Sequence, residues 1–330
     1  ATKKGAMGYL LDKNSGRRLP LRAHHTIGRS SDQVDTVVAA PEVSRMHAVL
    51  EWFHDGWQLR DLSRNGTWLN GLRLKPADNT PVSAGATIVF GAKNGPTWEL
   101  VDDSAPCSLL LAESADAATL PLTSYLFLPD EANPQLVIHY SNLRRSWMYH
   151  RIGQTDRDLP EFPLAHNQPL EAAGHAWRVF LADSATATEL VSGASQRLAD
   201  FEFLYDLSLD EEITRLRLRR EEREIDLGER THHYLLLQLA RHRAEEALAG
   251  LDDKSQGWVD TELLARELGI EVSHLNILIF RARKQIAEKL PPNVDPEPLV
   301  ERRKGRVRFG CPRFAIFKGE RITHALSLIH

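Results

Sequence analysis

Short apolar runs separated by clusters of Gly, Asn, Asp and Ser fill the first part of the chain. Examples are Ala48-Val-Leu-Glu-Trp52 and Thr87-Ile-Val-Phe90. No segment here repeats its apolar residues with the 3.6-residue period of an amphipathic helix. Many short strands with turns between them are typical of a sandwich rather than of a parallel sheet with helices. The pattern predicts an all-β sandwich over residues 1–106.

The next stretch, residues 107–188, is also rich in short apolar runs and echoes the first. Residues 108–122 follow the pattern of residues 8–21, and residues 169–180 follow residues 81–90 with an offset. Two such matches indicate a repeat, so we expect a second β-rich domain related to the first. Residues 184–200, rich in Ala, Ser and Thr, are expected to form a linker or a lone short helix, and we assign residues 189–200 to the linker.

Residues 201–320 change to a mixed α and β pattern. Alternation over Arg215–Arg219 predicts a strand, with Glu224–Leu227 as its hairpin partner. Three helices are expected next, with N-caps at Thr231, Asp260 and Ser273, the second ending at Gly269 and the third near Leu290. A basic hairpin over residues 299–309 follows, with Lys304-Gly305 at its tip, and residues 321–330 are assigned to a tail.

The third predicted helix has two faces. Its buried stripe is Leu275, Ile279, Ala282 and Ile286. The opposite face carries His274, Leu278, Arg281, Gln285 and, at its margin, Lys284. Leu278 and Phe280 are apolar in excess of what the core requires. These two could contact thymine methyl groups, pack on a partner, or mean that the helix does not read bases.

Composition narrows the class of protein. The 330 residues are 42% apolar and 26% charged, as in ordinary globular proteins, and no apolar run is long enough to cross a bilayer. The two cysteines, Cys107 and Cys311, form neither a disulfide framework nor a metal motif, which favours the cytoplasm. Residues 281–321 hold 12 basic and 5 acidic side chains, a balance of +7. This cationic stripe favours a polyanionic partner, most obviously nucleic acid.

Catalytic and metal motifs are missing from the sequence. We find no phosphate-cradling glycine loop, nucleophile elbow or zinc motif. The sequence therefore predicts a binding protein and no enzyme, with no cofactor and no metal.

Four short motifs instead supply donors for a phosphate. They are Gly28-Arg29, Ser44-Arg45-Met46-His47, Asp61-Leu-Ser-Arg-Asn65-Gly-Thr67 and Asn70-Gly71, each in a predicted loop. Loops at one end of a sandwich can converge on one ligand. A phosphate with a charge of about −1.5 to −2 and three acceptor oxygens requires guanidinium, hydroxyl and amide donors of this kind.

This ordered set closely resembles the signature of the forkhead-associated (FHA) domain over about residues 8–103. The resemblance implies that Arg29 and Ser44 hold the phosphate of a phosphothreonine peptide, that Arg45 assists, and that Asn65 binds the peptide main chain. Gly28, His47, Gly66 and Thr67 would be pocket scaffold, and Asn70 would help to shape the same loop. Arg64 stands where the family usually has a small hydroxyl residue, so it either adds a cation or obstructs the pocket. Residues 107–188 lack these motifs, which implies a degenerate FHA-like spacer or docking domain.

The order of elements over residues 201–320 resembles the winged helix-turn-helix of OmpR/PhoB-class response regulators. By this resemblance the third helix enters the major groove and the hairpin reaches phosphates or the minor groove. The expected DNA contacts are His274, Arg281, Lys284, Arg302, Arg303, Lys304, Arg306 and Arg308.

Together the two resemblances predict a multidomain, phosphothreonine-reading transcription regulator that answers to a Ser/Thr kinase. Known bacterial regulators combine the same two modules. The expected partners are a phosphothreonine protein or the kinase itself, double-stranded DNA and a second copy of the chain, with no membrane. Two alternatives stay open. One is a phosphorylation-dependent scaffold whose winged helix docks proteins, and the other is a constitutive DNA binder whose FHA domain serves only as a dimer contact.

Overall fold

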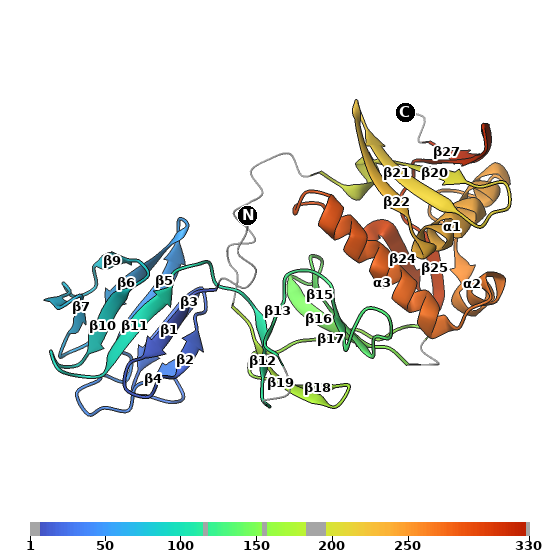
Figure 1. The fold of residues 1–330 in the computed structure, drawn as a ribbon. Helices are drawn as coiled ribbons and strands as arrows, with labels where there is room; N and C mark the ends of the chain where they lie inside the picture. Colours follow the sequence, from blue (N-terminus) through green and yellow to red (C-terminus); the bar gives the residue numbers. More distant parts are fainter. Residues whose placement is uncertain (1–6, 115–117, 154–156, 183–195, 328–330) are drawn as a thin grey trace. The chain divides into compact units, whose positions relative to one another are not determined.

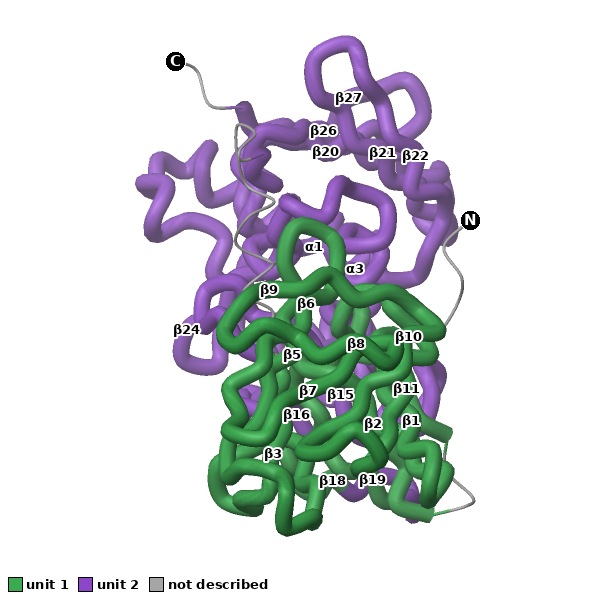
Figure 2. Tube along the Cα trace, turned by 90° about the vertical axis from the view of Figure 1, so that its left-hand side faces the viewer, with its two compact units in different colours: residues 1–123, 165–170, 176–189 green, residues 124–164, 171–175, 190–330 purple. Residues whose placement is uncertain are grey.

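A computed structural model describes residues 7–114, 118–153, 157–182 and 196–327 of the chain. The chain divides into two compact units, residues 1–123, 165–170 and 176–189 and residues 124–164, 171–175 and 190–330 (Figure 2). Residues 107–188, predicted as one domain, are thus shared between the units. Most of the predicted linker, residues 189–200, lies outside the described residues; its end forms a 3₁₀ turn at Leu198–Asp200.

The first unit contains the predicted sandwich (Figure 1). One sheet has the order β2-β1-β11-β10-β7-β8 and the other β4-β3-β5-β6-β9. Side chains from both sheets meet in one core, where Leu10 and Ile88 of the first face Ile27 and Leu50 of the second. The strands are β1 (Tyr9–Asp12), β2 (Arg18–Pro20), β3 (His24–Gly28), β4 (Thr36–Val37), β5 (Ala48–Phe53), β6 (Gly56–Asp61), β7 (Thr67–Leu69), β8 (Leu72–Arg73), β9 (Asn79–Val82), β10 (Ala86–Phe90) and β11 (Thr97–Asp102).

Two further sheets repeat the strand order of this sandwich. The first has the order β13-β12-β19-β18, which matches β2-β1-β11-β10, and the second has β14-β15-β16-β17, which matches β3-β5-β6-β9. The described part of residues 107–182 contains strands and no helix. The strands are β12 (Leu109–Ala112), β13 (Leu120–Pro121), β14 (Leu126–Leu128), β15 (Leu136–Ser141), β16 (Ser146–Arg151), β17 (Phe162–Pro163), β18 (Pro169–Ala172) and β19 (His175–Phe180).

The C-terminal part of the second unit contains a five-stranded sheet of order β22-β21-β20-β26-β27. Its strands are β20 (Glu202–Leu207), β21 (Thr214–Arg220), β22 (Arg223–Glu229), β26 (Phe314–Lys318) and β27 (Arg321–Leu326). The predicted hairpin is confirmed, since Leu218 pairs with Ile225. Residues 321–326, assigned to a tail, form β27 instead. An edge strand is held by hydrogen bonds to one neighbour and buries little, so its sequence pattern is weak.

The same part holds the three helices of the described chain: α1 (Thr231–Leu248), α2 (Thr261–Leu268) and α3 (Val272–Lys289). Asp260 caps α2 and Gly269 ends it in the left-handed conformation, as predicted. The other two predicted caps are wrong, because α1 and α3 begin at Thr231 and Val272 without a side-chain cap. A small sheet, β23 (Val259–Asp260), β25 (Arg306–Phe309) and β24 (Val300–Arg303), follows, with a 3₁₀ turn at Glu297–Leu299 before β24. No helix in the described residues is long and apolar enough to span a membrane.

The end of β3 lies unusually close to the loop before β5. A Cβ atom on Gly28 would lie 2.1 Å from the carbonyl oxygen of Arg45, which is backbone and cannot rotate away. Because the backbone of Arg29 also donates to the Ser44 carbonyl (2.9 Å), the two loops are held at this distance.

We therefore expect Gly28→Ala to lower the free energy of unfolding of the first unit by about 1–3 kcal/mol, the usual cost of overpacking. Chemical denaturation followed by tryptophan fluorescence measures the change. Gly56→Ala is the matched control, because a Cβ there meets nothing within 4 Å. Equal stability of the two variants would contradict the close approach.

Candidate functional site

All five residues predicted to contact the phosphopeptide line one cavity of about 720 Å³ in the first unit. Arg29 follows β3, Ser44 and Arg45 precede β5, and Arg64 and Asn65 lie between β6 and β7. The structure thus brings together three loops that are far apart in sequence. The sandwich places them at one end because β3, β5 and β6 are neighbours in one sheet.

His47 connects the loop that contains Ser44 to the loop that contains Gly66. The ring is fully buried, accepts a hydrogen bond at Nδ1 from the Ser44 backbone (3.0 Å), and lies with Nε2 3.1 Å from the Gly66 carbonyl. Acceptance at Nδ1 places the proton on Nε2, which donates to Gly66. Burial lowers the pKa of His47, so the ring is neutral at pH 7. This is the scaffold role that the sequence analysis predicts.

Asp61 organises the third loop. Its buried carboxylate accepts hydrogen bonds from Ser63 Oγ (2.7 Å) and Thr67 Oγ1 (2.8 Å), and Ser63 Oγ in turn accepts from the backbone of Gly66 (2.7 Å). Gly66 has a φ of +107°, which disfavours any side chain. The sequence analysis included Thr67 and Gly66 but missed the central position of Asp61.

Asn65 and Asn70 are both held by backbone groups. The Asn65 side-chain amide donates to the Glu42 carbonyl (2.7 Å), which leaves its Oδ1 for a ligand main chain. Asn70 accepts from the backbone of Thr87 (2.9 Å) at the β7–β8 turn, outside the residues that line the cavity. Its effect on the pocket is therefore indirect.

The cations of the pocket are available to an anion. Arg29, Arg45 and Arg64 are exposed, and none of the three forms an ion pair among the residues that the structure describes. Arg64 lines the cavity, and its backbone donates to Ser44 Oγ (3.2 Å), so the Ser44 hydroxyl still has a proton to donate. Three guanidinium groups and a hydroxyl around one cavity can bind a dianion through charge-assisted hydrogen bonds.

Two apolar residues at the cavity were not predicted. Met46 is 42% exposed and Leu62 is 41% exposed, and both belong to the lining. Exposed apolar side chains beside a charged pocket provide a surface for an apolar side chain of a bound peptide. Their sequence signal is weak, because single apolar residues in loops are common.

The predicted DNA-contact residues divide into two groups. Arg303, Lys304 and Arg306 are exposed on the turn between β24 and β25, and they form no ion pair within the described ranges. The turn is fixed because the Thr261 hydroxyl donates to the Gly305 carbonyl (2.7 Å). These three cations are free to meet phosphates.

The exposed face predicted for α3 is covered by residues 124–164 of the same unit. Arg281 donates to the backbone carbonyls of Glu131 and Ala132, and Lys284 forms an ion pair with the Glu131 carboxylate. Phe280, only 1% exposed, packs on Phe127 and other apolar residues of this segment. The sequence analysis left contact with thymine methyl groups, packing on a partner, or loss of base reading open for Phe280; the structure packs it on residues of the same chain instead. Leu278 lies instead in the core below α3.

The remaining expected contacts are also engaged. Arg302 donates to Asn276 Oδ1, and burial and the nearby Arg283 guanidinium lower its pKa. Arg308 pairs with Glu301 (2.7 Å) and stacks over the Trp258 ring at 4.8 Å. His274 is half-buried, and burial lowers its pKa. In this conformation these residues, unlike Arg303, Lys304 and Arg306, are not presented to a ligand.

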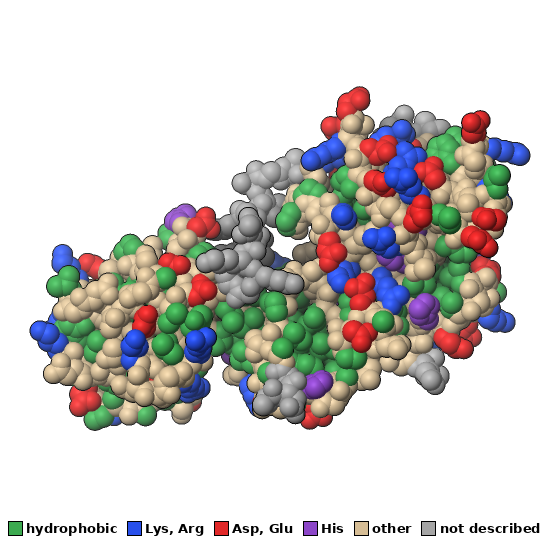
Figure 3. Space-filling view, in the orientation of Figure 1, with side chains coloured by type: hydrophobic (Ala, Val, Ile, Leu, Met, Phe, Trp, Pro, Cys, Tyr) green, Lys and Arg blue, Asp and Glu red, His purple; other side chains and the backbone are tan. Residues whose placement is uncertain are grey.

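Three of the four arginines of β21 are paired with carboxylates, whereas the fourth, Arg220, lies over the Phe201 ring at 6.0 Å. Arg215 pairs with Asp226, Arg217 with Asp206 and Glu224, and Arg219 with Glu202. Basic and acidic side chains accordingly alternate over β21 and β22 in Figure 3. Within the basic stretch of residues 281–321, the exposed cations that form no ion pair among the described residues are Lys289, Arg303, Lys304, Arg306 and Arg321.

Comparison with known proteins agrees with the site in the first unit. Residues 25–91 match the model of the FHA domain family, so the chain contains an FHA domain there. No curated protein matches the chain. The family match covers the pocket and leaves the C-terminal part unassigned.

Solved structures similar to the chain include the MEK1 FHA domain with the HOP1 pThr318 peptide, at 24% identity over 30% of this chain and 98% of that one, with a TM-score of 0.27. EmbR of Mycobacterium tuberculosis with a low-affinity phosphopeptide is 29% identical over 32% of this chain and 26% of that one, with a TM-score of 0.28. The N-terminal FHA domain of Saccharomyces cerevisiae Rad53p with a phosphothreonine peptide is 21% identical over 29% and 93%, with a TM-score of 0.27.

Removal of one pocket cation tests the site. Arg29→Ala should weaken binding of a phosphothreonine peptide that the wild type selects, since each charge-assisted hydrogen bond lost is worth roughly 1.5–3 kcal/mol. Calorimetric titration with the phosphorylated peptide and its unphosphorylated twin measures the effect. Arg17→Ala, an exposed arginine outside the cavity lining, should bind as the wild type does. Equal affinity of Arg29→Ala and wild type would remove Arg29 from the pocket.

Proposed function

We propose that the protein binds a phosphothreonine segment of a partner protein through its FHA domain. Arg29 and Ser44 hold the phosphate, Arg45 and Arg64 add positive charge, and Asn65 receives the peptide main chain. The observation that carries this proposal is the cavity of about 720 Å³ that all five side chains line. The partner is a protein phosphorylated by a Ser/Thr kinase, or the kinase itself.

The second part of the proposal is that residues 201–320 are a winged helix that binds double-stranded DNA, which makes the protein a transcription regulator and not an enzyme. Two helices, α2 and α3, followed by the β24–β25 hairpin support this assignment. The three exposed cations of the hairpin turn support this assignment, because the wing of a winged helix contacts phosphates. An α-helix such as α3 fits the major groove, where side chains reach base edges.

DNA reading by α3 requires a change of conformation, because residues 124–164 cover its face. The segment occupies the donors of Arg281 and Lys284 through Glu131 and buries Phe280 against Phe127. We therefore assign the described conformation to a closed state in which only the wing is free. Departure of residues 124–164 would release both cations toward a groove.

The alternative function is a phosphorylation-dependent scaffold in which the winged helix docks proteins. One observation favours it: α3 already packs on protein through Phe280, an apolar residue that a DNA-reading face does not need. In this case the basic hairpin is a solvated surface and the chain has no affinity for DNA. The two functions differ in the salt dependence of binding and in the response to uncovering α3.

The wing contribution is measurable as a salt slope. Each phosphate neutralised steepens the dependence of log affinity on log salt by about 0.9 for duplex DNA, so Arg303→Ala with Arg306→Ala should reduce the slope by up to about 2. Fluorescence anisotropy of the full chain with a DNA duplex at several salt concentrations gives the slope. Arg215→Ala with Arg219→Ala, which removes two arginines paired with carboxylates, should leave it unchanged. No affinity for DNA even at low salt would favour the scaffold.

Uncovering α3 should increase DNA affinity. Phe127→Ala with Glu131→Ala removes the apolar seat of Phe280 and the carboxylate of Lys284 without changing any predicted DNA contact. A shift of 1.4 kcal/mol toward the open state corresponds to about tenfold tighter binding. The same anisotropy assay measures it, with Leu143→Ala, a residue 87% exposed in the same segment, as control. Unchanged or weaker binding would mean that the covered face does not read DNA.

A further inference from the structure

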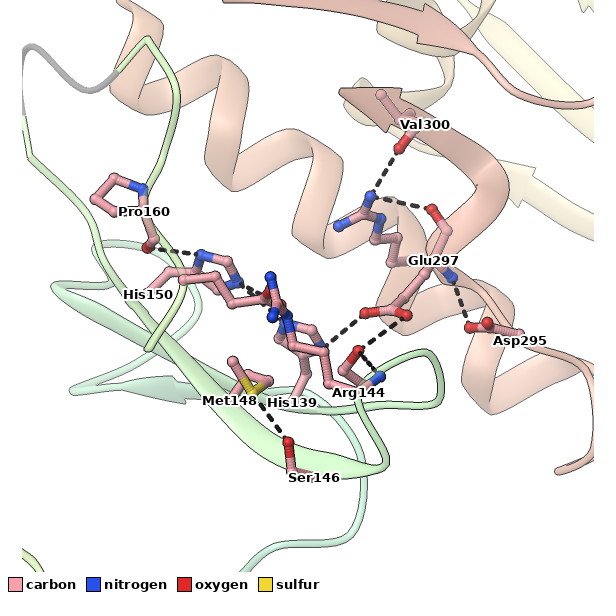
Figure 4. A network of polar contacts seen from close by, with 12 residues as sticks. His139, Arg144, Ser146, Met148, His150, Pro160, Asp295, Glu297 and Val300 are labelled. Atoms are coloured by element: carbon pink, nitrogen blue, oxygen red, sulfur yellow. Dashed lines mark hydrogen bonds and ion pairs between the residues drawn. The ribbon is translucent and has the colours of Figure 1, made fainter. Parts of the chain in front are cut away.

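Two buried histidines of the second unit face each other under α3 (Figure 4). His139 on β15 and His150 on β16 are 1% and 6% exposed, and their Nε2 atoms lie 3.0 Å apart. They are diagonal neighbours on two paired strands, since Val137 pairs with His150 and His139 with Met148. The strand register therefore turns both rings to the same face of the sheet.

A carboxylate completes a three-residue cluster. Glu161 Oε1 lies 3.6 Å from His139 Nε2 and 3.9 Å from His150 Nε2. Tetrahedral zinc with bonds of about 2.0–2.2 Å to nitrogen and oxygen places its ligand atoms roughly 3.3 Å apart. The three observed separations, 3.0, 3.6 and 3.9 Å, bracket that value. We propose that His139, His150 and Glu161 form a binding site for a divalent transition metal; Zn²⁺ and Fe²⁺ both bind two imidazoles and one carboxylate, and Zn²⁺ is the ion used to test the site.

Residues around the cluster form hydrogen bonds that orient its side chains, as residues next to metal ligands usually do. His150 Nδ1 lies 3.2 Å from the Pro160 carbonyl, which can only accept, so the proton is on Nδ1 and the lone pair of Nε2 points at the cluster. The other oxygen of Glu161 accepts from Arg144 Nε (2.6 Å), which turns Oε1 toward the histidines. Two ligands are thus oriented by contacts outside the cluster.

The Nδ1 atom of His139, which faces away from the cluster, can carry the ring proton when Nε2 binds a metal. This atom is buried without a well-aligned hydrogen-bond partner among the described residues, and Glu297 Oε1 lies 3.7 Å from it. In the metal-free form His139 donates from Nε2 to His150. When a metal occupies Nε2, the proton of His139 moves to Nδ1, where the Glu297 carboxylate can accept it. The neutral ring therefore binds without net loss of a proton.

Charge and access also fit a metal ion. The carboxylates of Glu161 and Glu297 lie 3.6 and 3.7 Å from His139 and bring negative charge to the cluster. The guanidinium groups nearby are Arg144, which pairs with Glu161, and Arg283 and Arg302. His150 and Glu161 also line a cavity of about 810 Å³, which gives an ion a path and leaves a fourth position for water.

The position of the cluster suggests what the metal does. The ring centroids of His139 and His150 lie 6.1 and 4.9 Å from the ring centroid of Phe280 on α3. A metal that joins β15, β16 and Glu161 would make the seat of Phe280 rigid. The proposed metal would therefore act on the packing of residues 124–164 against α3, as a structural or regulatory site.

Zinc titration of the full chain tests the proposal. After treatment with a chelator, the protein is titrated with Zn²⁺ in competition with a chromophoric chelator, and we expect one tight site per chain. Glu161→Gln and His150→Gln should abolish that site, and Arg144→Met should weaken it by about 10–100-fold through loss of an outer partner. His24→Gln is the matched control, because His24 pairs with Glu51 (2.8 Å) on the surface without a second histidine.

Co²⁺ gives a second readout that does not depend on stability. Its visible absorption should indicate a four-coordinate site in the wild type and lose that signature in Glu161→Gln, a partly exposed residue whose change leaves the buried histidines in place. The proposal is overturned if the wild type has no tight site, or if Glu161→Gln and His150→Gln, checked by circular dichroism, bind zinc as tightly as the wild type. The histidine pair would then be a hydrogen-bonded element of the core.

Discussion

The packing of residues 124–164 on α3 centres on the burial of one aromatic ring, that of Phe280. This side chain leaves α3 away from the stripe that packs on the sheet, and it is nevertheless 1% exposed, among Tyr125, Phe127, Val137 and Leu159. Burial of such a ring is worth roughly 1.5–3 kcal/mol, enough to decide where a small segment sits. Once Phe280 is seated, Arg281 and Lys284 lie within reach of Glu131, and the histidine pair lies beneath the ring. The covered helix and the candidate metal cluster thus have the same physical origin.

In the FHA pocket, in contrast to α3, the guanidinium groups are exposed to water and form no ion pair among the described residues. Its buried groups are neutral or fully hydrogen-bonded, as with His47 and Asp61, whereas its guanidinium groups stay in water. Burying unpaired cations would cost several kcal/mol each, and pairing them with carboxylates would compete with the phosphate. An exposed cluster of cations on rigid loops avoids both costs. On β21, by contrast, Arg215, Arg217 and Arg219 are all paired with carboxylates, as expected for a structural surface and not for an anion-binding one.

The sequence predicts local features better than contacts between distant segments. The FHA motifs could be read because residues such as Gly28, Ser44 and Asn65 occur in a fixed order, and the cap of α2 follows from Asp260 alone. The edge strand β27 was missed because an edge position needs little apolar patterning. The sequence showed Phe280 only as an apolar residue that the core does not require. The residues that it packs on could not be predicted, because they lie more than a hundred positions away in the chain. His139 and His150 do not have a metal-motif spacing, because the strand register and not the spacing brings them together.

If α3 reads DNA, the free-energy difference between the closed state, in which residues 124–164 pack on α3, and the open state must lie within a limited range. It must be large enough to keep the helix covered and small enough for ligands to reverse. A closed state favoured 99 to 1 corresponds to about 2.7 kcal/mol, and reversing that ratio requires about 5.5 kcal/mol of differential binding. A phosphopeptide contributes only the difference between its affinities for the closed and open states, however tightly it binds. DNA would contribute as well, because Arg281 and Lys284 would exchange Glu131 for phosphates or bases. If a phosphopeptide bound to the FHA domain also favoured the open state, each ligand would supply part of the difference, and the protein would respond to the two together.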